Sequence, residues 1–432
     1  METEVFATSV PEMNALGNGI CKIDGCVIFC KGAVDGDRIQ ARIVDSRKNY
    51  KIAEVTSCDV PSPFRCNPAC PAFGTCGGCT LQHITYAHEL DVKKASIETA
   101  LRRAGLEIVK VEEILSASPL RYRNKGVYHF AKDGKVSFLQ EASHQYVPVS
   151  DCLLCPESFS KIAGDTETFF AGKSIQPSYL YLRTNSAASQ LCVVLGIEKG
   201  VAKDALKAYA SYIREKHPEI IGVLAGSGSH PEERGAKLDC LWGQDYISES
   251  FLGLTLKISA SSFFQVNTAA AQLLCQKAVD LLNPAPGEYG IDLYCGTGIF
   301  GMAIAKLHPK VYVTGVEINP AAVADAKENA TANGLSNVGF FCGDSGDFAK
   351  STYGSIDFAL IDPPRAGCSD KMLQALCKLQ PRKILYISCE PGTLGRDLKK
   401  LSEKGYTLSH IVACDLFPRT KHVETAALLT RK

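Results

Sequence analysis

The chain has 432 residues, which is enough for roughly two to four domains of about 100–200 residues each. Its net charge of +1 does not indicate a nucleic-acid partner by itself, because such binding depends on how charge is distributed over the surface. The odd number of cysteines, 19, and a start without a basic and then apolar leader predict a cytoplasmic protein with reduced thiols. The sequence has no apolar run of about 18 residues, so we expect no membrane span.

Residues 1–57 are predicted to form short strands joined by tight turns. Asp24-Gly25 precedes an apolar segment and predicts a β-hairpin. Polar and apolar residues alternate after Arg38, which favours a small β-barrel. Prolines from Pro61 onward predict that the barrel ends there and a linker begins.

The rest of the chain divides into two predicted parts. Residues 58–245 mix helical and strand patterns, with a helix expected over 87–105 that ends at Gly105. From 246 to 432 strands alternate with helices, which favours an α/β fold with a parallel, doubly wound, Rossmann-like sheet. The apolar runs that predict its strands are Tyr289–Tyr294, Val311–Val316, Val338–Cys342, Phe358–Ile361 and Ile384–Ile387.

A glycine-rich loop follows the first of these strands. Gly296, Gly298 and Gly301 have the G-x-G-x-x-G spacing, and Glu317 ends the next strand about 20 residues later, where a carboxylate can bind ribose hydroxyls. This pattern alone fits a nicotinamide dehydrogenase equally well. Asp292 lies four residues before the loop, in the D-x-x-x-G-x-G spacing usual for S-adenosylmethionine sites, and favours that cofactor.

A second motif, Asp362-Pro-Pro-Arg365, follows the predicted strand Phe358–Ile361. Open parallel sheets bind their ligands at this carboxyl end of the strands, and the two prolines fix the backbone that aims the carboxylate. Enzymes that methylate exocyclic amines often have an aromatic residue after the prolines. Arg365 stands in that place, which argues against amine methylation.

A candidate nucleophile and a candidate base lie further along the chain. Cys389 directly follows the apolar run that ends with Ser388, and Glu424 precedes another apolar run. A single cysteine after a strand is usually a packing residue, and a single glutamate is usually solvated. Together with the glycine loop and the Asp362 motif, however, the two residues favour covalent catalysis followed by proton abstraction.

These motifs resemble those of the RNA uracil-5-methyltransferase family, in particular its 23S ribosomal-RNA branch. The segments that carry the resemblance are Phe263–Asn267, Asp292–Gly298, Asp362–Arg365, Ser388–Pro391, Thr393–Asp397 and His422–Glu424. The resemblance extends to the N-terminal barrel, which is similar to a TRAM domain, an OB-like RNA-binding module. Two residues depart from the pattern of the branch: Glu390 replaces a common asparagine, and Gly395 replaces a common alanine.

The resemblance implies S-adenosylmethionine-dependent methylation of carbon 5 of a uridine in structured RNA. Cys389 resembles the nucleophile, whose thiolate adds to carbon 6 and makes carbon 5 able to accept a methyl group. Glu424 resembles the base that removes the carbon-5 proton, so that the thiol is expelled. The implied cofactor contacts are Gln265, Tyr294, Glu317 and Asp362, with Asp344 near the adenine. No obligate protein partner is expected.

A cysteine cluster lies after the barrel, in the segment Cys70-x5-Cys76-Gly-Gly-Cys79. The two glycines let the backbone wrap a metal ion or cluster, and four thiolates suit [4Fe–4S] or zinc. The resemblance implies an iron–sulfur cluster with Cys152 as the fourth ligand; free thiols are the remaining alternative. Two other cysteines compete for the fourth place, Cys66 and Cys155. The spacing is not the C-x3-C-x2-C associated with radical chemistry, so we expect a structural or RNA-contacting role.

The segment Arg121-Tyr-Arg-Asn-Lys125 interleaves cations with an aromatic ring, as phosphate contact and base stacking require. We therefore expect it to contact RNA. The stretch 38–51 of the barrel also holds several cations, but acidic residues nearby offset them. The target uracil must leave its stack to reach Cys389, which favours a loop or a single strand as the substrate.

Three other functions compete with this interpretation. A uridine in the T-loop of transfer RNA is the alternative target, but the barrel and the cysteine cluster favour the ribosomal branch. A nicotinamide oxidoreductase would leave Cys389, Glu424 and the Asp362 motif without a role. An iron–sulfur RNA-binding protein with an inactive catalytic domain is disfavoured by the intact pair of Cys389 and Glu424.

Overall fold

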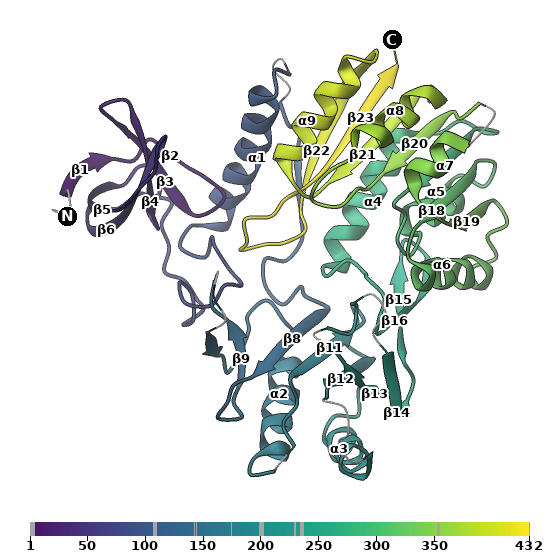
Figure 1. Ribbon diagram of the computed structural model, residues 1–432, viewed down its shortest axis with the longest axis horizontal. Coiled ribbons are helices and arrows are strands. Elements are labelled where there is room, and N and C mark those ends of the chain that lie inside the picture. Colours follow the sequence, from purple (N-terminus) through teal and green to yellow (C-terminus); the bar gives the residue numbers. More distant parts are fainter. Residues whose placement is uncertain are drawn as a thin grey trace.

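The computed structural model describes residues 5–106, 110–141, 143, 145–173, 175–197, 203–228, 230–233, 237–351 and 355–431. Within these ranges the strands form sheets of six, seven and eight strands and one two-stranded ribbon. Figure 1 shows the N-terminal sheet in purple, the central sheet in blue and teal, and the C-terminal sheet with its helices in green and yellow. Over these ranges no helix has the length and apolar character needed to cross a lipid bilayer.

The N-terminal sheet has the order β1-β5-β6-β4-β3-β2. Its strands are β1 (Val5–Ser9), β2 (Glu12–Met13), β3 (Asn18–Ile23), β4 (Cys26–Lys31), β5 (Arg38–Ser46) and β6 (Tyr50–Val60). The predicted hairpin is confirmed: β3 pairs antiparallel with β4, and the positive φ of Asp24 (48°) and Gly25 (78°) is typical of the turns that match strand twist. Buried residues such as Ile39 and Cys30 form a separate small core. The assignment of this sheet to a TRAM domain stays a prediction.

The central sheet has the order β10-β9-β8-β11-β12-β13-β14. Its strands are β8 (Lys125–Phe130), β9 (Val136–Leu139), β10 (Tyr146–Pro148), β11 (Tyr179–Thr184), β12 (Leu191–Gly196), β13 (Ile220–Ser227) and β14 (Lys237–Gly243). Helices α2 (Glu157–Phe170) and α3 (Lys203–Lys216) cover one face. The ribbon of β15 (Tyr246–Phe251) and β16 (Leu254–Ser259) packs into the core on the other face.

The C-terminal sheet confirms the prediction of a doubly wound α/β fold. Its order is β19-β18-β17-β20-β21-β23-β22-β7, and β17 to β21 are parallel, whereas β23 is antiparallel to β21 and β22. The five predicted strands appear as β17 (Tyr289–Leu293), β18 (Tyr312–Glu317), β19 (Val338–Cys342), β20 (Phe358–Ile361) and β21 (Lys383–Ser388). The last two strands are β22 (Tyr406–Asp415) and β23 (Glu424–Arg431).

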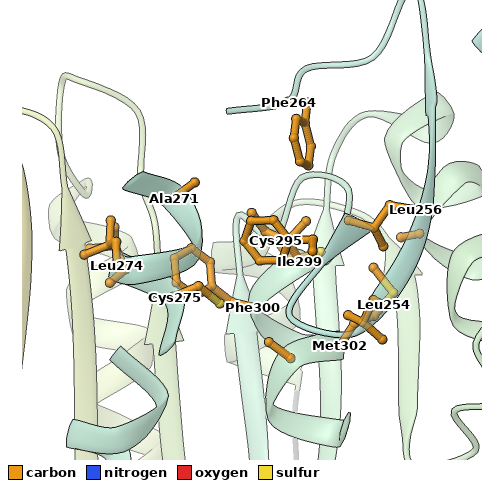
Figure 2. Close-up of a cluster of buried hydrophobic side chains, with 14 of the residues drawn as sticks. Leu254, Leu256, Phe264, Ala271, Leu274, Cys275, Cys295, Ile299, Phe300 and Met302 are labelled. Carbon is orange, nitrogen blue, oxygen red and sulfur yellow. The ribbon is translucent and has the colours of Figure 1, made fainter. Parts of the chain in front are cut away.

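Helices cover both faces of this sheet. On one face lie α4 (Thr268–Leu282), α5 (Ile299–Leu307) and α6 (Pro320–Ala332), whose apolar side chains form one core cluster. Figure 2 shows part of it, with the α4 residues Leu274 and Cys275 on one side and the ribbon residues Leu254 and Leu256 on the other. On the other face lie α1 (Tyr86–Arg103), α8 (Asp370–Leu379) and α9 (Pro391–Ser402), around a second cluster. A short helix, α7 (Ser345–Ser351), follows β19.

Two elements from the predicted central part of the chain belong to the C-terminal sheet. The short strand β7 (Ile114–Ser116) pairs parallel with β22 at the sheet edge, and α1 lies beside α9 (Figure 1). The contact between the helices explains the departure at Gly395. A Cβ atom there would lie 2.9 Å from the backbone oxygen of Ala100, so only glycine permits this approach.

Candidate active site

The predicted nucleophile and base lie at the same end of two neighbouring antiparallel strands. Ser388, the last residue of β21, pairs with Thr425 of β23. Cys389 comes directly after Ser388 and Glu424 directly before Thr425, so both lie at the same end of this strand pair, and the charge of Glu424 contributes to raising the pKa of the Cys389 thiol. Asp362 follows β20, the other neighbour of β21, and therefore lies at the same edge. Sheet topology thus brings together three of the predicted site residues.

The carboxyl group of Glu424 is shielded from water. The residue is 6% exposed, and burial, followed by the charge of Asp362, raises the pKa of Glu424 to about 8. Burial also raises the pKa of Asp362 to about 7. A base whose pKa lies near neutral pH suits proton abstraction, since it combines sufficient basicity with a substantial ionised fraction.

The thiol of Cys389 is half-buried. Burial, and next the charge of Glu424, raises the pKa of Cys389 to about 11, while the guanidinium of Arg365 opposes this rise. The aromatic position after the two prolines is therefore occupied by a cation that favours the thiolate. Arg365 also lies 3.4 Å from His422, measured between Nη2 and Nε2. Burial and the charge of Arg365 lower the pKa of His422 to about 4, so this imidazole is neutral at pH 7.

Helix α9 holds the loop that carries Arg365. Thr393 Oγ1 donates to the Arg365 carbonyl at 3.1 Å. The carboxylate of Asp397 is fully buried and accepts hydrogen bonds from the Cys368 amide at 2.7 Å and from the Tyr386 hydroxyl at 2.7 Å. Sequence reasoning included Asp397 in a motif but assigned it no task. Its burial and its partners show that it positions this loop.

The glycine loop joins β17 to α5 as predicted. Asp292 is 1% exposed, and its Oδ2 accepts from the Gly301 amide at 3.0 Å, while its Oδ1 has no partner among the described residues. Burial raises the pKa of Asp292 to about 8. Gly298 has φ +78°, and a Cβ atom there would lie 2.4 Å from the Phe340 ring, so the turn requires glycine. Gly296 also has a positive φ and faces open space.

The carboxylate of Glu317 is oriented toward this loop. Its Oε2 accepts from the Gly296 amide at 3.1 Å, and its Oε1 accepts from the Asn319 amide at 2.7 Å. Beside it, Ile318 and Phe341 are 58% and 51% exposed, at the carboxyl ends of β18 and β19. Sequence reasoning missed both residues, because their apolar character does not distinguish them from the strand residues that enter the core.

The remaining predicted cofactor contacts lie on neighbouring loops. Tyr294 is half-buried, with φ 63°, directly after β17. Asp344 is exposed after β19, and its Oδ1 accepts from the Asp347 amide at 2.9 Å. The backbone oxygen of Gln265 accepts from Asn124 Nδ2 at 2.8 Å, which ties the segment before α4 to the central sheet. Three features around the glycine loop suit a nucleoside-containing cofactor. They are the polar groups of the loop, the buried Oδ1 of Asp292 that has no hydrogen-bond partner among the described residues, and the exposed apolar side chains of Ile318 and Phe341.

A cavity of about 910 Å³ opens beside the nucleophile. The N-terminal sheet forms one wall, α1 forms another, and Cys389 and His422 lie along its lining. The wall from the N-terminal sheet includes the rings of Phe29 and Tyr50, whose centroids are 5.5 Å apart. Cationic residues in the lining are Lys31, Arg103 and Lys421. Aromatic rings with nearby cations are the components that bind unpaired nucleotides.

The segment Arg121–Lys125 has a different task from the predicted RNA contact. Arg121 forms a bidentate pair with Asp151, at 2.9 and 2.6 Å, and Lys125 pairs with Glu232 at 2.7 Å. The Tyr122 hydroxyl donates to the Pro418 carbonyl at 3.0 Å. These side chains make internal bonds, so the expectation that they contact RNA is not supported.

The predicted cluster cysteines are neighbours, although they lie on two separate segments. Burial raises the pKa of Cys79 to about 11, and the charges of Cys152 and Cys70 contribute. Burial also raises the pKa of Cys76, and the charges of the same two thiols contribute to this rise. The sulfur of Cys79 accepts a hydrogen bond from Gln82 Nε2 at 3.1 Å. In the part of the chain that the structure describes, however, no three Cys, His, Asp or Glu side chains converge closely enough to form a metal site.

The competitors for the fourth place have other surroundings. The exposed Cys66 donates to the Gln82 carbonyl. Cys155 is 2% exposed and is hydrogen-bonded to Cys152. The charge of Cys152 contributes to raising the pKa of both Cys76 and Cys79. A set of four thiols, of which Cys79 accepts a hydrogen bond at its sulfur, is chemically suited to an iron–sulfur cluster.

Comparisons with known proteins identify the family of the chain. A family model described as tRNA (Uracil-5-)-methyltransferase matches residues 233–432. An uncharacterized RNA methyltransferase of Listeria innocua is 32% identical over 98% of this chain and 97% of that protein. A second one, of Halalkalibacterium halodurans, is 31% identical over 100% of this chain and 98% of that protein.

A solved structure has the same fold along nearly the whole chain. It is the Pyrococcus abyssi tRNA (uracil-54, C5)-methyltransferase in complex with S-adenosyl-L-homocysteine, with a TM-score of 0.80 and 24% identity. The match covers 98% of this chain and 100% of that one. Taken with the sequence relatives, these findings show that the chain belongs to the RNA (uracil-5-)-methyltransferase family and is a transferase of the S-adenosylmethionine-dependent class.

Proposed function

We propose that this protein methylates carbon 5 of a uridine in RNA through a covalent adduct between Cys389 and carbon 6 of the uracil. The observation that carries the proposal is the pairing of Ser388 with Thr425, which brings the adjoining residues Cys389 and the buried Glu424 to the same end of one strand pair. A thiol paired with a base of raised pKa at the edge of a nucleotide-binding sheet matches the two halves of this reaction.

Each residue has a definite task in the reaction. The Cys389 thiolate, favoured by Arg365, forms a bond to carbon 6, and the electron pair moves to carbon 5. S-adenosylmethionine, when bound, supplies the methyl group that carbon 5 accepts. Glu424 then takes the proton from carbon 5, the bond between sulfur and carbon 6 breaks, and the uracil ring recovers its double bond. The carboxylate accepts this proton at a site shielded from water.

Residues around the glycine loop hold the cofactor in this proposal. Glu317 binds the ribose hydroxyls, and Ile318 and Phe341 contact the adenine with their exposed apolar side chains. Asp344 is placed at the rim to accept from the adenine, and Asp362 lies between the cofactor site and Glu424. Gln265 and Tyr294 complete the contacts from the loops before α4 and after β17.

The experiment is a trap with an RNA that carries 5-fluorouridine at the target. Fluorine cannot leave as a proton, so the wild-type protein is expected to form a covalent adduct that survives denaturing electrophoresis. Cys389→Ala should form none and should not methylate uridine. Cys240→Ala, which removes an exposed cysteine of the central sheet, is the matched control and should behave as wild type. Turnover by Cys389→Ala would overturn the covalent mechanism.

We propose a uridine of 23S ribosomal RNA as the target, on the basis of the motif resemblance. The Pyrococcus abyssi structure aligns with this chain over its N-terminal part too, so the presence of that part does not separate ribosomal from transfer RNA as the target. Methylation of both RNA types in vitro, followed by mass mapping of the modified uridines, distinguishes them. Methylation confined to the T-loop would overturn the ribosomal assignment.

We also propose that Cys70, Cys76, Cys79 and Cys152 hold a [4Fe–4S] cluster. The support is the chemistry of a four-thiol set and the electrostatic influence of Cys152 and Cys70 on Cys76 and Cys79. The hairpin of β9 and β10 adjoins the cysteine loop through a bridge between Cys76 and Gln140. Bound there, the cluster would cross-link the loop to the segment that contains Cys152 and so stabilise the central part of the chain.

A further inference from the structure

The loop between β22 and β23, Leu416–Val423, is named here the catalytic loop, because it leads directly into Glu424. Its connection to the rest of the protein is a buried ionic network centred on Lys93 of α1. Lys93, Glu89 and Asp415 are each 0% exposed. The ammonium Nζ donates to Glu89 Oε1 at 2.8 Å, to Asp415 Oδ1 at 2.7 Å and to the Phe417 carbonyl at 3.1 Å. All three donors of the ammonium are therefore used.

The network continues from the ammonium along the catalytic loop. The Phe417 carbonyl, which accepts from Lys93, also accepts from the Thr420 hydroxyl at 2.8 Å. The same hydroxyl oxygen accepts from the His422 amide at 3.3 Å. Two residues later comes Glu424. Lys93 is thus linked to the base through three consecutive hydrogen bonds and one short piece of backbone.

Arg419 fixes the other side of the loop. Its backbone has φ 68°, a conformation that costs energy for a residue with a side chain. Its amide donates to Glu89 Oε1 at 2.6 Å, so the carboxylate that binds Lys93 also holds this strained residue. The Arg419 carbonyl accepts from the Thr80 and Leu81 amides at 2.9 and 3.2 Å. The conformation is therefore determined from α1 and from the segment that follows Cys79.

An ion pair in the interior is a weak source of stability, because desolvation opposes the attraction. It does, however, specify one geometry, since a displaced carboxylate or ammonium would be left unpaired in the interior. The network lies between α1 and the catalytic loop, which leads into Glu424. We therefore expect the network to influence the position of the base.

We propose that Lys93 is a positioning residue for the general base: its ammonium holds the catalytic loop so that Glu424 faces the target carbon. The inference rests on the covalent mechanism proposed above. Cys389 follows β21 and Arg365 lies in the loop after β20, and among the described residues the hydrogen bonds of Lys93 go to Glu89, Asp415 and Phe417 rather than to either of them. Loss of the ammonium should therefore impair proton removal and leave nucleophilic addition nearly intact.

The test compares two rates for Lys93→Met, which keeps the length of the side chain and removes its charge. On uridine RNA, we expect kcat to fall about 100-fold, in the range for loss of a positioned base, with KM for RNA unchanged and with a covalent protein–RNA species accumulating. On 5-fluorouridine RNA, where no proton is removed, the rate of adduct formation should stay within about threefold of wild type. Lys257→Met, which breaks an ion pair with Glu328 in another part of the fold, should change neither rate.

A parallel fall of both rates, or no fall in either, would overturn the proposal. If Lys93→Met does not fold, Thr420→Val provides a second test, because it removes the hydroxyl between Phe417 and His422 and leaves the ion pairs in place; the same split between the rates is expected. If the wild-type protein forms no adduct with 5-fluorouridine RNA, the covalent mechanism itself fails, and this outcome is distinct from a failure of the role of Lys93.

Discussion

Replacement of Glu424 by glutamine should slow turnover and stabilise the protein at the same time. Glutamine has the shape of glutamate but neither its charge nor its basicity. Loss of a general base costs about 10²–10⁴-fold in rate, and the covalent adduct should accumulate because methyl transfer precedes proton removal. The effect on stability follows from the burial that raises the pKa of Glu424 from its ordinary value of 4.5 to about 8.

The magnitude of the stability effect depends on pH. Because the folded state holds this proton more tightly than the unfolded state, the free energy of unfolding decreases as pH rises from about 4.5 to about 8. A pKa difference of this size corresponds to about 5 kcal/mol at most once the carboxylate is fully ionised. Glutamine avoids this cost. At about 2–4 °C per kcal/mol, the Tm of Glu424→Gln should exceed that of wild type by several degrees at pH 9.

The assay is thermal unfolding of both proteins at pH 5 and pH 9, beside single-turnover methylation. At pH 5 the wild-type carboxyl is protonated, so the two Tm values should nearly coincide. Glu403→Gln, at an exposed position after α9, is the control and should show no pH-dependent difference. Equal Tm values for Glu424→Gln and wild type at both pH values would refute the burial argument, and wild-type turnover by the variant would show that another group is the base.

Three further predictions follow from the site. The kcat should rise at least about tenfold from pH 6 to pH 7, since ionised Glu424 accepts the proton and the population of the Cys389 thiolate also grows toward its pKa of about 11; a profile that falls over this range would contradict the role of Glu424. Gly298→Ala should lose affinity for S-adenosylhomocysteine in calorimetry because of the clash with Phe340, whereas Gly253→Ala, with a similar φ of +75° and no atom near its Cβ, should bind normally. Protein prepared without oxygen should contain iron and sulfide that Cys76→Ser loses and Cys240→Ser retains; four free thiols without iron would refute the cluster.

The C-terminal sheet and its site could be predicted because parallel strands place their carboxyl ends at one edge. Some apolar runs in the C-terminal part end next to a residue with a proposed task, such as Asp362 after the run Phe358–Ile361 or Cys389 shortly after the run Ile384–Ile387. The topology of an open parallel sheet places residues that follow its strands at the same edge. We can therefore expect these residues to lie near one another from the sequence alone. The chemistry of Cys389 and Glu424 then follows from their residue types.

Contacts between distant segments could not be predicted in this way. Lys93 and Asp415 are separated by more than 300 residues, and a lysine within a helical pattern normally indicates a solvated face. The basic segment at Arg121 shows the opposite error. Its cations suggested a nucleic-acid surface, but their carboxylate partners Asp151 and Glu232 come from other parts of the chain. A local charge pattern does not reveal which charges are neutralised by folding.

The position of Cys389 reconciles two conflicting requirements of the proposed reaction. The base must be shielded from water, whereas a polymer must reach the nucleophile from solvent. Glu424 meets the first requirement inside the antiparallel pair of β21 and β23. Cys389 is one residue beyond the end of β21, on the wall of the cavity shared with the N-terminal sheet and α1. A uracil that leaves its stack can therefore approach the thiol from this cavity, and the proposed reaction requires its carbon 5 to face the buried carboxylate. An enzyme with both groups on one open surface would allow water to compete for the base.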